Sequence, residues 1–168
     1  MDKYLGDMIH QDDLAASIEA TVEERVGRIM AAGHEIKAVL DDYRLQAVGG
    51  MMRDWDLWNL TLIPSLMNNC STWIGISTKL VERLEAIQEK YIRMILEVPV
   101  STPKVALRAE TGLLSMKHRI WGEKFNLFTA VIRMKDGLAK QVLVEQIEQG
   151  WPGRAQEVEK ICKDIEVP

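Results

Sequence analysis

Apolar residues recur with a helical period along most of the chain. Between residues 14 and 43 they fall within one narrow arc at about 100° per residue: Leu14, Ile18, Val22, Ile29, Ile36, Leu40 and Tyr43. This stripe predicts a long amphipathic helix whose first turn is capped by Asp12 or Asp13. Gly33 lies inside the pattern as a candidate kink or close helix crossing.

A second helix is predicted from Met51 to Trp73, after the break at Gly49-Gly50. Pro64 lies within it and removes one backbone hydrogen bond, so we expect a bend near Asn59 to Leu62. The third helix has the clearest pattern and runs from about Ser77 to Glu97. Its apolar seam recurs at spacings of four, three, four and three residues: Leu80, Leu84, Ile87, Tyr91 and Met94.

Four shorter helices complete the prediction. Thr102 is expected to cap the first, with Pro103 as its first helical residue and Gly112 at its end. Ser115 is expected to cap a helix from Met116 to about Lys135, and two more follow over 138–149 and 155–165. The sequence therefore predicts an all-α multi-helix bundle with a possible short N-terminal β-hairpin or strand. We expect one domain over 1–168, made of segments 1–11, 12–97 and 98–168.

Charge is unevenly distributed along a chain whose net charge is −4. Residues 79–140 hold twelve Lys/Arg against seven Asp/Glu, whereas the flanking segments are acidic. No apolar run approaches the ~18–20 residues of a membrane helix, and the first ten residues do not resemble a signal peptide. We therefore expect an intracellular protein, nuclear or cytoplasmic, without a membrane partner. Cys70 and Cys162 are expected to be reduced and mostly buried.

Catalytic patterns are missing from the sequence. Asp7, Asp12 and Asp13 cluster near the N-terminus, but adjacent aspartates at a helix start are typical of capping. The three histidines and two cysteines are not at metal-ligand spacing, and no phosphate-binding or dinucleotide-binding glycine pattern occurs. We therefore expect no metal, no cofactor and no enzymatic activity of the chain on its own.

Basic residues form two candidate binding surfaces. On the third helix Lys79, Arg83, Lys90 and Arg93 fall within about 80° of arc, beside an acidic edge. On the helix from Met116, the basic candidates are Lys117, Arg119 and Lys124. Rows of this kind bind phosphate backbones, but they are also typical of a solvated face crossed by ion pairs such as Glu89–Arg93. The five tryptophans are expected to fill the core.

Short motifs in the first 135 residues resemble, in order and spacing, the segment after the catalytic palm in reverse transcriptases of non-LTR retrotransposons. The first is Lys3-Tyr4-Leu5-Gly6 and the second is Ile63-Pro64-Ser65-Leu66 followed by Trp73. The third helix resembles the family's "leucine … glutamine-x-lysine-x-x-arginine-x-isoleucine-leucine" pattern at Leu84, Gln88, Lys90, Arg93, Ile95 and Leu96. The last group is Ser101-Thr102-Pro103, Glu110, Gly112, Leu113 and Arg119.

The chain departs from that family in several respects. The aromatic-x-Asp-Asp motif that holds the catalytic aspartates does not occur in it, nor does a terminal Cys/His zinc knuckle. Asn68-Asn69-Cys70-Ser71 stands where many members have a Tyr-Gly-rich turn. The resemblance therefore implies a primer-grip hairpin, thumb and helical linker without the palm.

The resemblance implies that the chain grips an RNA–DNA duplex, or its RNA template, beside a reverse-transcriptase palm domain. Lys3 and Tyr4 would approach the primer end, and the basic residues of the two later helices would meet phosphates. The alternative is a helical module that pairs with a protein partner or with itself and binds no nucleic acid. The Leu80–Met94 seam would serve such a dimer equally well.

Overall fold

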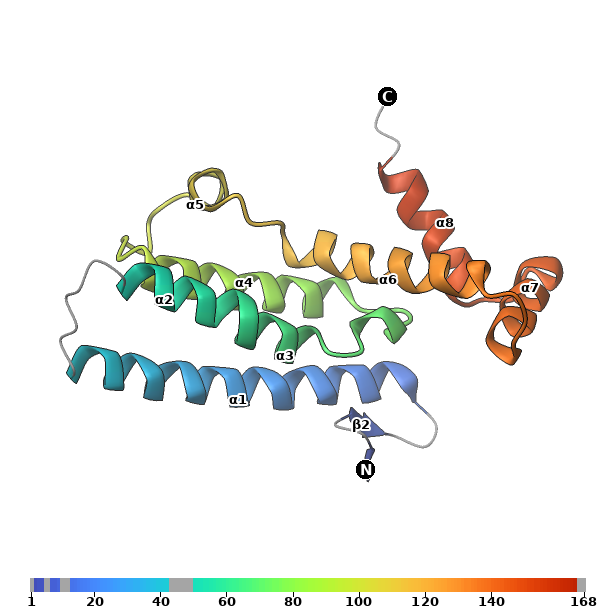
Figure 1. Ribbon diagram of the computed structural model, residues 1–168, viewed down its shortest axis with the longest axis horizontal. Helices are drawn as coiled ribbons and strands as arrows, with labels where there is room; N and C mark the ends of the chain where they lie inside the picture. The colour runs from blue at the N-terminus through green and yellow to red at the C-terminus, as the bar shows by residue number, and fades with distance from the viewer. Residues whose placement is uncertain (1, 5–6, 10–12, 43–49, 166–168) are drawn as a thin grey trace. The chain divides into compact units, whose positions relative to one another are not determined.

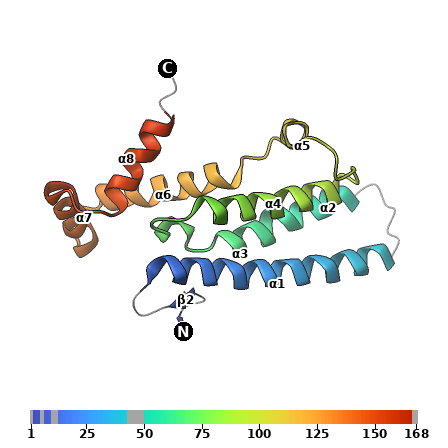
Figure 2. The same cartoon turned by 180° about the vertical axis from the view of Figure 1, so that it is seen from behind.

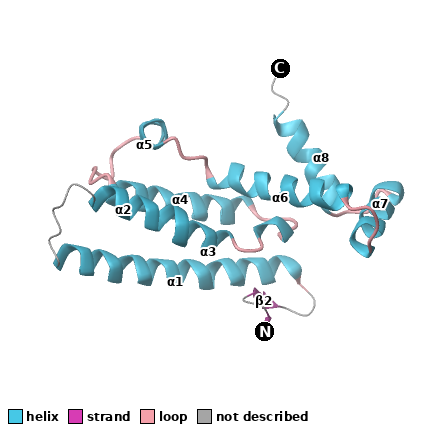
Figure 3. Ribbon diagram, in the orientation of Figure 1, coloured by secondary structure: helices cyan, strands magenta, loops and turns pink. Residues whose placement is uncertain are grey.

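The computed structural model describes residues 2–4, 7–9, 13–42 and 50–165, and the side chains of 13–32 and 54–165. Helices dominate the described residues, as the all-α prediction requires (Figures 1 and 3). The chain divides into two compact units, which we call the first and second units. The first comprises Met1–Asn68 and Ser77–Met116, and the second comprises Asn69–Ile76 and Lys117–Pro168. The single domain expected over 1–168 stays a prediction, because compactness alone does not show which segments unfold together.

The first unit begins with the predicted hairpin and long helix. Strands β1 (Asp2–Tyr4) and β2 (Asp7–Ile9) pair antiparallel, and β2 packs against helix α1 (Leu14–Asp42). Asp13 caps α1, since its Oδ1 accepts the Ala16 N–H at 2.9 Å. Helix α1 continues through Gly33 as one element. The predicted cap and long helix are confirmed, and Ile18, Val22 and Ile29 of the predicted stripe are buried. Leu14 is 57% exposed, and the side chains of Ile36, Leu40 and Tyr43 lie outside the described residues.

The second predicted helix is divided into three parts. Helix α2 (Gly50–Leu57) leads into a π-helical segment, η1 (Trp58–Leu62), and then α3 (Ile63–Met67). In η1 the Ile63 N–H donates to Trp58 O, five residues back. Pro64 has no N–H to continue the α-helical ladder, so the irregular turn falls where a bend was expected.

The predicted end of this helix at Trp73 is wrong. Helix α3 ends at Met67, because Asn68 is extended, with ψ 132°, and Asn69 has a left-handed φ of 58°. Asparagine adopts that conformation more readily than most residues. A short 3₁₀ turn, η2 (Cys70–Thr72), follows in the second unit.

Helix α4 (Thr78–Ile95) forms the centre of the first unit. Ser77 caps it by accepting the Leu80 N–H at 3.2 Å. The predicted seam is buried at Leu80, Leu84, Ile87 and Tyr91, and α4 packs against α1, α2 and α5. Both views show α1 and α4 lying side by side (Figure 2).

An aromatic stack lies in this core. The ring of Trp58 from η1 stacks on Tyr91 of α4, with centroids 4.5 Å apart. The Tyr91 hydroxyl donates to Ile29 O of α1 at 3.0 Å. Burial raises the pKa of Tyr91. Tyr91 thus joins α4 to both η1 and α1.

Helix α5 (Lys104–Thr111) begins one residue later than expected. Pro103 is itself the N-terminal cap, with extended angles of φ −60° and ψ 140°, and its carbonyl accepts the Leu107 N–H. The predicted side-chain cap at Thr102 is therefore wrong, because Pro103 lies outside the helix. Gly112 ends α5 as predicted, with φ 63°.

The second unit contains helices α6 (Met116–Arg133), α7 (Leu138–Gln149) and α8 (Arg154–Ile165); Met116 alone is assigned to the first unit. Each lies within two residues of its predicted range, and α7 packs against α8. Cys70 is buried as expected, whereas Cys162 is exposed on α8, so that expectation was wrong. Trp58 and Trp73 are buried, but Trp151 is 52% exposed.

Candidate nucleic-acid interface

Three of the predicted phosphate contacts share one exposed face of α4. Lys79, Arg83 and Lys90 are exposed and lie within about 40° of arc. The buried seam centred on Leu84 is on another side of the helix. We call these three residues the α4 basic row. Helical geometry therefore places three cations on one solvent-facing surface.

Helix α5 engages two of the three acidic residues beside this row, and the third, Glu82, is exposed. Glu85 Oε2 pairs with Arg108 Nη2 at 2.8 Å, and Glu89 Oε1 lies 3.0 Å from Lys104 Nζ. The side chains of Glu85 and Glu89 are 13% and 8% exposed. Because α5 neutralises both groups, they oppose the α4 basic row much less than the sequence suggests.

Arg93 contributes to the internal structure of the first unit. Its side chain is only 17% exposed and lies 3.7 Å from Glu89 Oε2, consistent with the ion pair expected from their spacing. Its Nη2 also donates to Thr102 O at 3.2 Å. Arg93 therefore ties the end of α4 to the segment before α5, and the α4 basic row does not include it.

Arg83 has a partner of its own within the first unit. Its Nη2 lies 2.6 Å from Glu23 Oε2 of α1, with side chains 53% and 38% exposed. Exposed pairs of this kind stabilise a protein by less than about 1 kcal/mol. A phosphate can therefore compete with Glu23 for the guanidinium.

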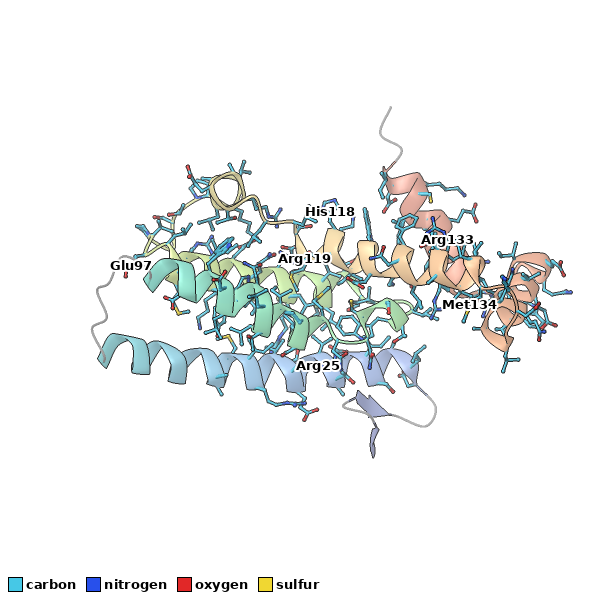
Figure 4. The ribbon with its side chains drawn as sticks, viewed as in Figure 1. Arg25, Glu97, His118, Arg119, Arg133 and Met134 are labelled. Carbon is cyan, nitrogen blue, oxygen red and sulfur yellow. The ribbon has the colours of Figure 1, made fainter. Side chains whose placement is uncertain are left out.

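The second unit places its three predicted contacts in different environments. Lys117 is exposed, and its Nζ lies 4.3 Å from the centroid of the Trp121 ring. Arg119 is half-buried, and burial lowers the pKa of its guanidinium. His118 and Arg119 are labelled on α6 in Figure 4.

Lys124 is buried, contrary to the exposure that a phosphate contact would require. Its Nζ pairs with Glu157 Oε2 of α8 at 2.8 Å, and its side chain is 5% exposed. Glu157 Oε1 also accepts the backbone N–H of Gly75, so three separate segments of the second unit meet at this carboxylate. We call this arrangement the Lys124–Glu157 pair. The sequence suggested that Lys124 would reach solvent between neighbouring helices, and the structure shows instead an internal ion pair.

The remaining two predicted contacts lie in β1. The backbones of Lys3 and Tyr4 pair with Met8 and Asp7, while their side chains lie outside the described residues. Of the nine predicted residues, the structure thus brings Lys79, Arg83 and Lys90 together on one surface. Lys117, Arg119 and Lys124 belong to the other unit.

Sequence reasoning missed several residues that shape these surfaces. Lys104 and Arg108 stand four residues apart on α5, and that spacing is the only local signal that they act together. Arg25 is 5% exposed and donates from Nη1 to the carbonyl oxygen of Asn68, the residue that follows α3. Its partner is 43 positions away in sequence, so no short-range pattern could identify it.

Two further observations concern chemistry and similarity. Within residues 13–32 and 54–165, no three His, Cys, Asp or Glu side chains gather as a metal site would, and in the described helices none is long and apolar enough to cross a membrane. The chain matches no family model, curated protein or solved structure.

Proposed function

We propose that this chain is a non-catalytic nucleic-acid-binding segment that grips a template–primer duplex, or its RNA template, by its phosphate backbone. The observation that carries the proposal is the α4 basic row, three exposed cations beside which two carboxylates, those of Glu85 and Glu89, are paired with α5. Phosphate contacts of this kind supply affinity without reading sequence. They suit an A-form duplex, which offers little base readout to side chains.

The resemblance to the thumb and linker of non-LTR reverse transcriptases supports the same role. Lys90 belongs to the helix motif of that resemblance, and α4 carries that motif. In this proposal the palm domain of a reverse transcriptase performs the chemistry, and the chain holds the nucleic acid beside it. Lys3 and Tyr4 at the hairpin would approach the primer end.

A salt titration tests the proposal. Each phosphate neutralised contributes about 0.9 to the slope of log K against log salt on a duplex. Changing Lys79, Arg83 and Lys90 together to Gln should therefore flatten that slope by about 2 to 3 for an RNA–DNA hybrid. The loss should be nearly the same for hybrids of different sequence.

The matched control changes Lys135, Lys160 and Lys163 to Gln. These lysines are also exposed. Because each variant loses three positive charges, the control and the test variant have the same net charge. Circular dichroism should show both variants folded, because exposed charges contribute little to stability. If the slope of log K against log salt is the same in the two variants, the α4 basic row does not contact the phosphates, and the proposal is refuted.

One observation favours the alternative of a protein-binding module. Helix α7 exposes apolar residues on more than one side: Leu138, Val142, Val144 and Ile147 are each at least 41% exposed. Exposed apolar residues of this number on one helix are typical of elements that pack against a partner. The seam at Leu84 and Ile87 no longer supports this alternative, because it is buried within the first unit.

The two functions respond differently to salt. An apolar interface is insensitive to salt or strengthened by it, whereas phosphate binding weakens steeply. If the wild-type chain shows no affinity for hybrid at low salt, and sediments as a dimer that Val142→Asp dissociates, the protein-binding module is the correct function.

A further inference from the structure

A cluster of cationic and aromatic side chains lies in the first two turns of helix α6. Lys117 Nζ lies over the face of Trp121, 4.3 Å from its centroid, and His118 meets the same ring edge-on with centroids 5.4 Å apart. Lys117 and His118 are exposed and Trp121 is half-buried. All three residues belong to the second unit, whereas the α4 basic row belongs to the first.

Trp121 does not lie on the buried side of α6. Ile120 and Val131 are buried, and they lie on the same side of the helix, within about 20° of each other. Trp121 lies about 100° from Ile120, and Phe125 and Phe128 follow it within about 60° of arc. These three aromatic residues are all half-buried, so they form a partly exposed row beside the core side.

The charge around this row favours an anionic partner. Apart from Lys124, which is paired internally with Glu157, helix α6 carries three Lys/Arg and one acidic residue, Glu123. Glu123 lies about 160° around the helix from Trp121, on the opposite side. The ring therefore has a cation on its face and no carboxylate from its own helix nearby. A flat aromatic surface beside an exposed lysine matches a ligand that has both a π-face and a phosphate.

We propose that Trp121 is a stacking platform for an unpaired base of a single-stranded nucleic acid, and that the base displaces the Lys117 ammonium from the ring face onto a neighbouring phosphate. The inference rests on the proposed nucleic-acid function and adds a preference for single strands. Bases in a duplex are already stacked on each other, so only an unpaired base can present its face to the ring. His118, held against the ring edge, would fix the orientation of the indole.

The test compares Trp121→Ala with Trp151→Ala. Trp151 is a matched control because it lies in the same unit and is 52% exposed, with no ring or cation contact recorded for it in the described part of the chain. The probes are an oligouridylate of about 16 nucleotides and an RNA–DNA hybrid of the same length. Trp121→Ala should weaken oligouridylate binding by about tenfold and leave hybrid binding unchanged. Trp151→Ala should alter neither.

Two further variants protect the test against a folding defect. Trp121→Phe keeps an aromatic face and should retain most of the oligouridylate affinity. Lys117→Gln changes an exposed residue and should lower the single-strand salt slope by about 0.7. If Trp121→Phe loses as much affinity as Trp121→Ala, or if Lys117→Gln leaves the slope unchanged, the assignment of these roles is wrong.

The outcomes separate this inference from the proposed function. If the wild type binds hybrid through the α4 basic row while Trp121→Ala and Trp151→Ala bind oligouridylate equally, the stacking platform is refuted and the proposed function stands. If oligouridylate binding depends on Trp121 but hybrid binding does not depend on α4, the proposed function fails as stated and the platform stands. Absence of binding to both probes overturns both.

Discussion

The two units of this chain bury their apolar residues to very different extents. Among the described side chains, seventeen buried apolar residues belong to the first unit and seven to the second. Large exposed apolar residues show the reverse, with five in the first unit and eight in the second. The first unit therefore buries most of its large apolar side chains in one core. The second unit keeps more of them exposed to solvent, as interaction surfaces do.

The two units also use polar contacts differently. In the first unit, ion pairs such as Glu85–Arg108 attach α5 to α4 around a core that is already apolar. In the second, the Lys124–Glu157 pair lies inside and joins α6, α8 and the segment that contains Gly75. A buried pair contributes little net stability, but the loss of one member is costly because it leaves a buried charge. We therefore expect the second unit to depend on this pair and the first on packing.

The largest expected effect is a cavity in the core of the first unit. Leu84 is 0% exposed, so Leu84→Ala should lower the free energy of unfolding by about 3–5 kcal/mol. The matched control is Leu60→Ala, since Leu60 lies in the same unit and is 74% exposed; it should cost less than about 0.5 kcal/mol. Urea titration followed by circular dichroism measures both. Similar losses in the two variants would mean that α4 is not packed as described.

The second largest expected effect comes from removing one charge of the Lys124–Glu157 pair, which should destabilise the second unit only. Glu157→Gln leaves the Lys124 ammonium buried without a counter-ion, and it should cost about 2 kcal/mol because Glu157 is 19% exposed. Glu159→Gln is the matched control on the same helix, since Glu159 pairs with Lys163 at 2.6 Å in solvent. That control should leave stability unchanged.

The double variant Lys124→Met, Glu157→Leu completes this test. It removes both charges and should recover most of the stability lost by Glu157→Gln. Proteolysis at low enzyme concentration should show increased cleavage in residues 117–165 of Glu157→Gln, and little change in α1 or α4. Equal loss of protection in both units would show that they unfold together, as the prediction of a single domain requires.

The parts of the fold that sequence predicted are those set by local rules. The cap at Asp13, the start of α4 next to Ser77 and the end of α5 at Gly112 each depend on residues within four positions, and all three were found where they were predicted. The α4 seam was predicted because its period extends over four turns. The end of α3 was not, because a left-handed Asn69 is a weak local preference.

The candidate site shows the same division between local and distant determinants. Helical periodicity placed Lys79, Arg83 and Lys90 on one face, and the structure leaves all three exposed. The burial of Lys124 could not be predicted, because its partner Glu157 is 33 residues further along the chain. Periodicity gives the direction of a side chain from its own helix, and the neighbouring element then determines whether that direction is solvent.

The smallest expected effect concerns Tyr91, the residue that joins α4 to α1. At neutral pH Tyr91→Phe removes the hydrogen bond from the Tyr91 hydroxyl to Ile29 O and should cost about 1 kcal/mol. Burial raises the pKa of Tyr91 above the value of about 10 that a tyrosine has in an unfolded chain. The folded chain therefore keeps the phenol proton to higher pH than the unfolded chain does. This stability is complete below about pH 10 and is lost as pH rises through the folded pKa. As the pH rises above about 10, the wild type should therefore lose more stability than Tyr91→Phe, as urea titrations would measure. Parallel losses in the two proteins would show that Tyr91 has no part in the alkaline transition.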